Sequence, residues 1–241
     1  MIDAAPYIAR YQKGEWRTPI FHDMIMEDLE RMGGRPLTVL DIGCGHGFDL
    51  ETKHQKSIAD RAARYIGVEP DPDIAMDACF SETHRCVLEK APIKPNSVDL
   101  AFAVMVLEHV SEPDQFWGKL HSVLAEGGVF WGFTVDSRHW FRNASLLAEN
   151  LHLKEFYLRR LMGTRGTERY ENYPAFYRAN SPEQIRAHTK NFHSSEFINL
   201  SRVGQVDDYL PRILRPVSRY VDGVSIRRNW PGINLVVRLQ K

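Results

Sequence analysis

The chain has 241 residues, of which 43% are apolar and 26% charged, and its formal net charge is zero. This length buries a core without disulfide or metal cross-links, and the composition excludes a disordered chain. No apolar run reaches the ~20 residues of a membrane span, and residues 1–7 lack the features of a signal peptide. The cysteines Cys44, Cys79 and Cys86 form no paired motif. We therefore expect a reducing, cytoplasmic location.

The two halves of the chain differ in charge. Residues 1–137 contain 13 basic and 22 acidic side chains, a balance of −9, and residues 138–241 contain 18 and 9, a balance of +9. The basic half either binds an anionic partner or forms one face of a domain whose opposite face is acidic.

Helices and strands are expected to alternate over the first half. Residues 5–32 predict helices, because Phe21, Ile25 and Leu29 recur every four residues, and the glycines and proline of 33–36 end them. Apolar runs predict strands over 37–42, 65–68, 86–88, 98–104 and 129–133, with a helix over 114–124 before the last strand. Such alternation predicts a parallel sheet with helices on both faces.

The pattern changes after Val135. Residues 137–180 predict no strand and are rich in aromatic and arginine residues, so we expect an inserted cap. Ser181-Pro182 predicts a capped helix start. Strands are expected over 196–203 and 233–239, with a second insertion over 204–231. The whole chain is expected to be one domain, made of N-terminal helices (1–34), a core (35–136), the cap (137–180) and the C-terminal part of the sheet (181–241).

The strongest motif is a strand that runs into three glycines at alternate positions, Gly43, Gly45 and Gly47. Glycines permit a sharp turn, a following helix and close approach of a ligand. A triphosphate loop would need a lysine after the last glycine, and a dinucleotide loop would place the third glycine one residue later. Asp41 at the strand end suits a cationic ligand group. Glu69, at the end of the second strand, can accept hydrogen bonds from both hydroxyls of a ribose.

These motifs together resemble the class I S-adenosylmethionine-dependent methyltransferases, of the type 11 group found in bacterial glycan and secondary-product gene clusters. The residues that carry the resemblance are 41–47, 67–70, 91–92 with 97–100, 106–110 and 124–128. The resemblance implies an α/β fold with a seven-stranded Rossmann-like sheet in the order 3-2-1-4-5-7-6, in which strand 7 is antiparallel.

The resemblance also implies S-adenosyl-L-methionine as the donor and S-adenosyl-L-homocysteine as the product. The glycine loop would lie against the donor, Asp41 near its ammonium group and Glu69 on its ribose. The family usually has an aspartate before Glu89, so either Glu89 or backbone groups would bind the adenine. The implied donor site comprises Asp41, Gly43, Cys44, Gly45, Gly47, Glu69, Pro70, Leu88, Glu89, Val104 and Met105.

Two histidines are candidate general bases, because an oxygen nucleophile must lose a proton to a group with a pKa near 7. His109 follows the fourth strand and His139 follows the fifth. Asp136 is expected to orient His139 and raise its pKa. Glu108 is expected to be a helix cap or a surface acid. An amine acceptor would need no base.

The cap is expected either to bind the acceptor or to be an ordinary packing loop. Its aromatic and arginine side chains suit a site that stacks rings and pairs anions, namely Trp140, Tyr170, Tyr173, Tyr177 and Arg178. We expect O-methylation of a small molecule or glycan. N- or C-methylation, or a non-catalytic donor-binding subunit, are the alternatives.

The partners follow from charge and motif content. The near-neutral isoelectric point, about 7.2, disfavours nucleic acid. No motif asks for a metal. A homodimer is left open. Residues 208–217 are amphipathic and basic, and we expect them either to pack on the sheet edge or to touch a membrane or lipid-linked substrate.

Overall fold

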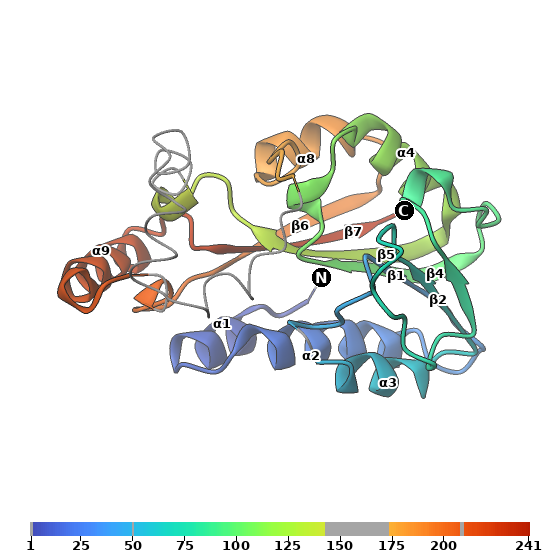
Figure 1. The fold of residues 1–241 in the computed structure, drawn as a ribbon, viewed down its shortest axis with the longest axis horizontal. Helices are drawn as coiled ribbons and strands as arrows, with labels where there is room; N and C mark the ends of the chain where they lie inside the picture. Colours follow the sequence, from blue (N-terminus) through green and yellow to red (C-terminus); the bar gives the residue numbers. More distant parts are fainter. Residues whose placement is uncertain (1, 50, 143–173, 208–209) are drawn as a thin grey trace.

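A seven-stranded sheet runs through the molecule (Figure 1). The computed structural model describes residues 2–49, 51–142, 174–207 and 210–241. The strands are β1 (Thr38–Ile42), β2 (Arg64–Val68), β3 (Glu82–His84), β4 (Val98–Val104), β5 (Leu124–Val135), β6 (Ser194–Leu200) and β7 (Asn234–Gln240). Their order is β3-β2-β1-β4-β5-β7-β6, and β7 is antiparallel to both of its neighbours. The expected strand order and the reversed last strand are confirmed.

Helices cover both faces of the sheet. Figure 1 shows α1 (Ala5–Gln12), α2 (Arg17–Arg31) and α3 (Lys53–Ala59) on one face, and α4 (Pro113–Val123) and α8 (Pro182–His188) on the other. Short 3₁₀ helices are η1 (Leu88–Lys90), η2 (Leu107–His109) and η5 (Arg212–Leu214). The last helix, α9 (Arg215–Arg227), lies at the end of the molecule away from α3 (Figure 1).

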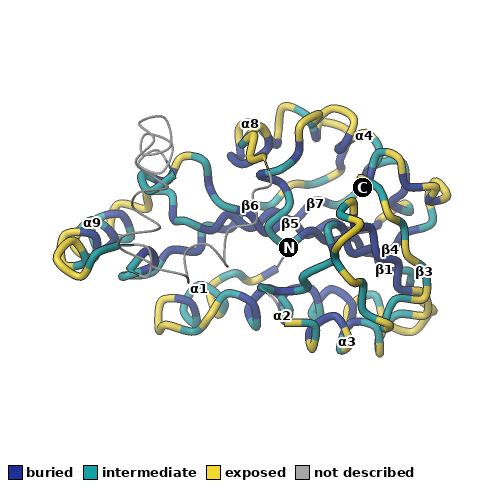
Figure 2. The backbone as a smooth tube through the Cα atoms, in the orientation of Figure 1, coloured by how far each residue is buried: buried dark blue, intermediate teal, exposed yellow. Residues whose placement is uncertain are grey.

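The core has two layers because successive side chains of a strand point to opposite faces. In β4, Leu100 and Phe102 pack in the layer that includes Phe21 of α2. Ala101 packs in the other layer, which includes Leu120 of α4. All of these side chains are buried, and Figure 2 shows the central sheet as the most buried part of the backbone. The uninterrupted apolar run of β4 reflects this burial on both faces.

Three expected boundaries differ in the structure. The third strand is Glu82–His84, and residues 86–88 instead lead into η1. β3 is an edge strand that pairs only with β2, so it needs no apolar run. Leu88 is buried although it lies in η1 and not in a strand. The helix after the glycine loop begins only at Lys53, because a short bridge between Phe48 and Glu51 intervenes. The fifth strand begins at Leu124, directly after α4.

The C-terminal elements follow the expected pattern with small shifts. Ser181 caps α8, since its hydroxyl accepts the backbone N–H of Gln184 at 3.2 Å, and Pro182 occupies the first helical turn. The strand expected over 196–203 lies at Ser194–Leu200, and the one over 233–239 lies at Asn234–Gln240.

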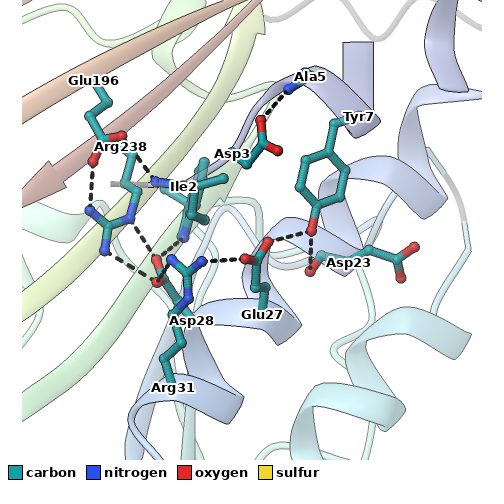
Figure 3. Close-up of polar contacts among 11 residues, drawn as sticks. Ile2, Asp3, Ala5, Tyr7, Asp23, Glu27, Asp28, Arg31, Glu196 and Arg238 are labelled. Carbon is teal, nitrogen blue, oxygen red and sulfur yellow. Dashed lines mark hydrogen bonds and ion pairs between the residues drawn. The ribbon is translucent and has the colours of Figure 1, made fainter. Parts of the chain in front are cut away.

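A buried ion pair joins α2 to the far edge of the sheet. The guanidinium of Arg238 donates from Nε to Asp28 Oδ2 at 2.7 Å and from Nη1 to Glu196 at 2.9 Å. Trp131 Nε1 also donates to Asp28, at 3.0 Å. Figure 3 shows Arg238 between the two carboxylates. This cluster connects α2, β5, β6 and β7 through one desolvated charge pair.

Candidate functional site

The glycine loop turns sharply at the carboxyl end of β1. The backbone N–H groups of Gly43 and Cys44 both donate to the carbonyl of Val68, at 2.7 and 3.2 Å. Gly43 has a φ of +70°, and a Cβ built on it would lie 2.4 Å from Cγ2 of Val106. The turn therefore requires glycine at this position, both for its backbone conformation and for the approach of Val106.

Glu69 is held directly against this loop. Its Oε2 accepts the N–H of Gly45 at 3.0 Å, and its Oε1 accepts the N–H of Asp71 at 2.9 Å. The carboxylate is 7% exposed. The residues present fit the nucleoside half of the donor, because a glycine-rich loop and a carboxylate that can accept two ribose hydroxyls meet at the carboxyl ends of β1 and β2.

Replacing Glu69 by alanine is expected to weaken S-adenosylmethionine binding by about 1.5–3 kcal/mol, the usual worth of hydrogen bonds to a charged group. Isothermal titration calorimetry measures this change. Glu126→Ala is the matched control, since this exposed glutamate lies near the start of β5, whereas the expected donor site lies at the carboxyl ends of the strands. Unchanged affinity in Glu69→Ala would remove Glu69 from the donor site, and tight binding of a nicotinamide nucleotide by the unaltered protein would overturn the donor assignment.

Asp41 lies beneath the loop. Its Oδ2 accepts hydrogen bonds from Gln55 Nε2 at 2.8 Å and from the Tyr65 hydroxyl at 3.0 Å. Gln55 also donates to the carbonyl of Cys44 at 2.7 Å, so Asp41 supports the loop through Gln55. Burial raises the pKa of Asp41 to about 7. The partners observed for its Oδ2 are thus protein side chains, and the place of Asp41 beside the donor's ammonium group stays a prediction.

This carboxyl should make stability depend on pH. In the unfolded chain Asp41 ionises near its ordinary value, but in the folded protein it ionises near pH 7, so between these values the folded state holds an extra proton. The free energy of unfolding should therefore fall as pH rises through this window, by at most ~1.4 kcal/mol per pH unit. Urea denaturation across the window should show this slope reduced in Asp41→Asn. Parallel profiles for the two proteins would contradict the prediction.

The remaining expected donor residues lie around the same sheet edge. Leu88 is buried in η1 and Glu89 beside it is half-buried, whereas Pro70 is exposed. At the end of β4, Val104 and Met105 are half-buried. Met105 has a φ of +56°, and its N–H donates to the carbonyl of Phe133 at 2.7 Å. This left-handed residue ends β4 and turns the chain into η2.

Glu108 is buried, which corrects the expectation of a helix cap or surface acid. Its Oε2 accepts the hydroxyl of Thr134 at 2.7 Å, and burial raises its pKa. The side-chain amide of Asn180, oriented to suit its neighbours, donates to the carbonyl of Leu107 and accepts the N–H of Glu108, both at 3.2 Å. These contacts fix η2 between β5 and the C-terminal end of the cap.

His109 contacts the described end of the cap. Its Nδ1 lies 3.0 Å from the carbonyl of Pro174, which can only accept, so Nδ1 carries the proton of the neutral ring and Nε2 the lone pair. The N–H groups of Phe176 and Tyr177 donate to the carbonyl of Glu108 at 2.7 and 3.2 Å. The cap residues 174–177 therefore lie against η2, beside the end of β4.

His139 is buried, and the expected rise of its pKa is wrong. Gln205 Nε2 lies 3.1 Å from its Nε2, the backbone N–H of Phe141 points at its Nδ1 at 3.3 Å, and burial lowers its pKa to about 4. Asp136 raises this pKa to a smaller extent, and its carboxylate is bound by the Arg138 guanidinium at 2.8 and 3.0 Å. Both ring nitrogens of His139 therefore face hydrogen-bond donors of the protein.

The structure places only some of the expected acceptor residues. Tyr170 and Tyr173 lie outside the described residues. Tyr177 is half-buried, with a φ of +52°, and the guanidinium of Arg142 lies 4.8 Å from its ring centre. Arg178 is exposed and donates to the carbonyl of Ser111 at 2.7 Å. Trp140 is half-buried, and its Nε1 has no hydrogen-bond partner in the part of the chain that the structure describes.

Sequence reasoning did not single out Gln55, Thr134 or Asn180. Gln55 and Asn180 are completely buried polar side chains, and each bonds a loop that carries expected site residues. An apolar pattern gives no signal for such residues, because their partners are distant in the sequence.

Neither metal ligands nor a membrane span is found in the described ranges. Within them, no group of three His, Cys, Asp or Glu side chains could hold a metal ion. The described helices also include none long and apolar enough to cross a membrane. The three cysteines are free thiols, and Cys44 is buried.

Comparisons with known proteins agree with this architecture. A family model described as a methyltransferase domain matches residues 40–132. An uncharacterized methyltransferase of Mycobacteroides abscessus is 30% identical over 142 residues, which are 50% of this chain. The chain spans about half the length of that relative, 52%.

Solved structures share the fold at low sequence identity. A SAM-dependent methyltransferase from Archaeoglobus fulgidus superposes with a TM-score of 0.56 at 12% identity, covering 99% of this chain and 100% of that one. Geranyl diphosphate C-methyltransferase from Streptomyces coelicolor has a TM-score of 0.52 at 14% identity, with 91% and 74% covered. Residues 40–132 are thus similar in sequence to a methyltransferase domain, and the strand order is that of the solved SAM-dependent methyltransferases.

Proposed function

We propose that the protein transfers a methyl group from S-adenosylmethionine to an oxygen atom of a small molecule or glycan. The observation that supports S-adenosylmethionine as the donor is the hydrogen bond from the N–H of Gly45 to the carboxylate of Glu69. It lies at the carboxyl ends of the adjacent parallel strands β1 and β2. When bound, the donor supplies a methyl group that is already electrophilic. The protein's task is to align the two reactants and exclude water.

The chain's own residues divide this task. Glu69 would accept hydrogen bonds from the ribose hydroxyls, and the glycine loop would allow the donor to approach the backbone. Val104 and Met105 would contact the methionine portion, since they end β4 beside the loop. Leu88 and Glu89 would lie along the adenine.

His109 supports the choice of an oxygen acceptor. Its half-buried ring is fixed through Nδ1 by the Pro174 carbonyl, which directs proton acceptance to Nε2. A hydroxyl needs such an acceptor at the moment of transfer, whereas a neutral amine can attack without one. The buried indole N–H of Trp140 would donate to an oxygen of the acceptor, and Tyr177 would contact it from the cap.

The decisive experiment combines isotopically labelled donor, the purified protein and fractionated extract of the source cell. A labelled product with the methyl group on oxygen is expected. A product methylated on nitrogen or carbon would select the alternative enzyme class. Donor binding without turnover in any fraction would favour a non-catalytic donor-binding subunit. The geranyl diphosphate enzyme does not choose among these, because its similarity extends to the fold alone.

A further inference from the structure

The helix α9 exposes apolar residues and buries polar ones. Its buried residues are Ser218, Asp222 and Ser225. On the outside, Val217 is 63% and Tyr220 is 71% exposed, and Figure 2 shows the outer turns of α9 as exposed. This is the reverse of the usual arrangement for a helix packed on a globular domain.

Hydrogen bonds fix this orientation. Asp222 accepts the backbone N–H of Gly204 at 2.8 Å and the side-chain amide of Gln205 at 3.1 Å. Gln205 in turn donates to His139, which is buried behind β5. Rotating α9 to bury Val217 and Tyr220 would break these bonds and leave buried polar groups without partners. The apolar residues therefore face outward as a consequence of the fold.

The exposed apolar surface continues into η5. Ile213 is 84% exposed and Leu214 is 48% exposed, so these two side chains of the 208–217 segment do not pack on the sheet edge. Val217, Tyr220, Val224 and Arg227 follow at helical spacing on one side of α9. We define the η5–α9 face as Ile213, Leu214, Val217, Tyr220 and the arginines around them.

The charge of this face is strongly positive. Residues 210–231 contain five arginines, at positions 212, 215, 219, 227 and 228, and a single acidic residue, the buried Asp222. Arg219 pairs with Asp207, and the side chains of Arg212, Arg227 and Arg228 lie at exposed positions. Apolar side chains interleaved with arginines, together with an outward tyrosine, match an interfacial amphipathic helix.

We propose that the η5–α9 face docks on the surface of an anionic lipid bilayer. The apolar side chains would enter the boundary between headgroups and acyl chains, and the arginines would contact the lipid phosphates. Long arginine stems can lie along the apolar surface while their charged ends remain at the headgroups. The acidic surplus of residues 1–137 argues against that half of the chain binding the same membrane.

Co-sedimentation of the full chain with large unilamellar vesicles tests this proposal. One set of vesicles contains phosphatidylcholine alone, and the other contains equal parts phosphatidylcholine and phosphatidylglycerol. Binding is expected only to the anionic vesicles, and it should weaken as salt is raised. The double variant Ile213→Asp/Val217→Asp should lower the partition coefficient more than about tenfold, and Arg212→Gln or Arg227→Gln about fivefold each.

Two control variants lie outside the η5–α9 face. Arg61→Gln removes an exposed arginine next to α3, and Val87→Asp places a charge at an exposed apolar position before η1. Both should bind vesicles like the unaltered protein. Thermal midpoints should be unchanged in all variants, because every replaced side chain is exposed.

Absence of binding to anionic vesicles would overturn the proposal, as would equal binding to neutral ones. Equal weakening by the controls would show that the effect does not belong to this face. Light scattering distinguishes membrane binding from self-association. If the protein does not bind vesicles but dimerises with rising concentration, and Val217→Asp abolishes the dimer, the face binds a second copy of the chain. The outcome is independent of methyl transfer, because no residue of the face belongs to the proposed donor or acceptor site.

Discussion

Replacing His109 by alanine is expected to lower the rate of methyl transfer to a hydroxyl about 10²–10⁴-fold, the usual contribution of a positioned general base. The reason is the fixed ring: Pro174 binds Nδ1, and the lone pair is therefore on Nε2. Affinity for S-adenosylmethionine should barely change, since this imidazole is not expected to bind the donor. Single-turnover rates measured against pH should show a rising limb in the unaltered protein, and this limb should be lost in the variant.

His139→Ala is the matched comparison. His139 is held by Gln205 and its pKa is about 4, so its loss should leave the rising limb of the profile in place. Near-normal rates and an unaltered pH profile in His109→Ala would exclude His109 as the base. Loss of the rising limb only in His139→Ala would assign the role of general base to His139 instead. If both variants keep their rates, an amine acceptor or the cap residue Tyr177 would be the next hypothesis.

Replacing Arg238 by alanine is expected to lower the free energy of unfolding by about 3–5 kcal/mol, because it removes the buried countercharge that is hydrogen-bonded to the carboxylate of Asp28. Arg238 also bonds Glu196, so its loss should loosen α2 and β6 together. Chemical denaturation followed by circular dichroism measures the change. The remaining partners compensate only in part, since Trp131 is a neutral donor and the guanidinium of Arg31 lies 3.8 Å from Asp28 on a side chain that is 45% exposed.

A surface pair provides the control for this prediction. Lys53 lies 2.7 Å from Glu51, and both side chains are about half or more exposed. Lys53→Ala should change stability by less than about 1 kcal/mol, as exposed ion pairs usually do. Similar losses in the two variants would show that burial of the Asp28–Arg238 pair contributes little to its effect.

Local patterns by themselves determined most of the donor half. The run from Val98 to Val104 is apolar because β4 lies in the middle of the sheet with helices on both faces, and its predicted bounds are confirmed. The three glycines mark a turn whose geometry depends on residues close together in the chain and on the absence of Cβ atoms. Glu69 follows its strand directly, so the strand pattern was enough to place it beside the loop.

Long-range contacts decided the roles of the ionisable groups. Gln205 lies 66 residues from His139 in the sequence and contacts its Nε2, a partner that sequence spacing does not predict. Glu108 is buried because Thr134 and Asn180 enclose it, although its position after a strand resembles a surface cap. A pKa depends on desolvation and on the partners that the fold supplies, so sequence spacing alone could not set it.

The position of β3 and the orientation of α9, at the edges of the fold, could be determined only from the tertiary structure. β3 is short and half-exposed, because an edge strand pairs on one side only, and its sequence therefore carries little apolar signal. The amphipathic pattern of α9 was visible in the sequence, but its orientation was not. Hydrogen bonds from Gly204 and Gln205 to Asp222 turn the polar side of α9 inward, and this direction follows from the partners the helix meets in the folded protein.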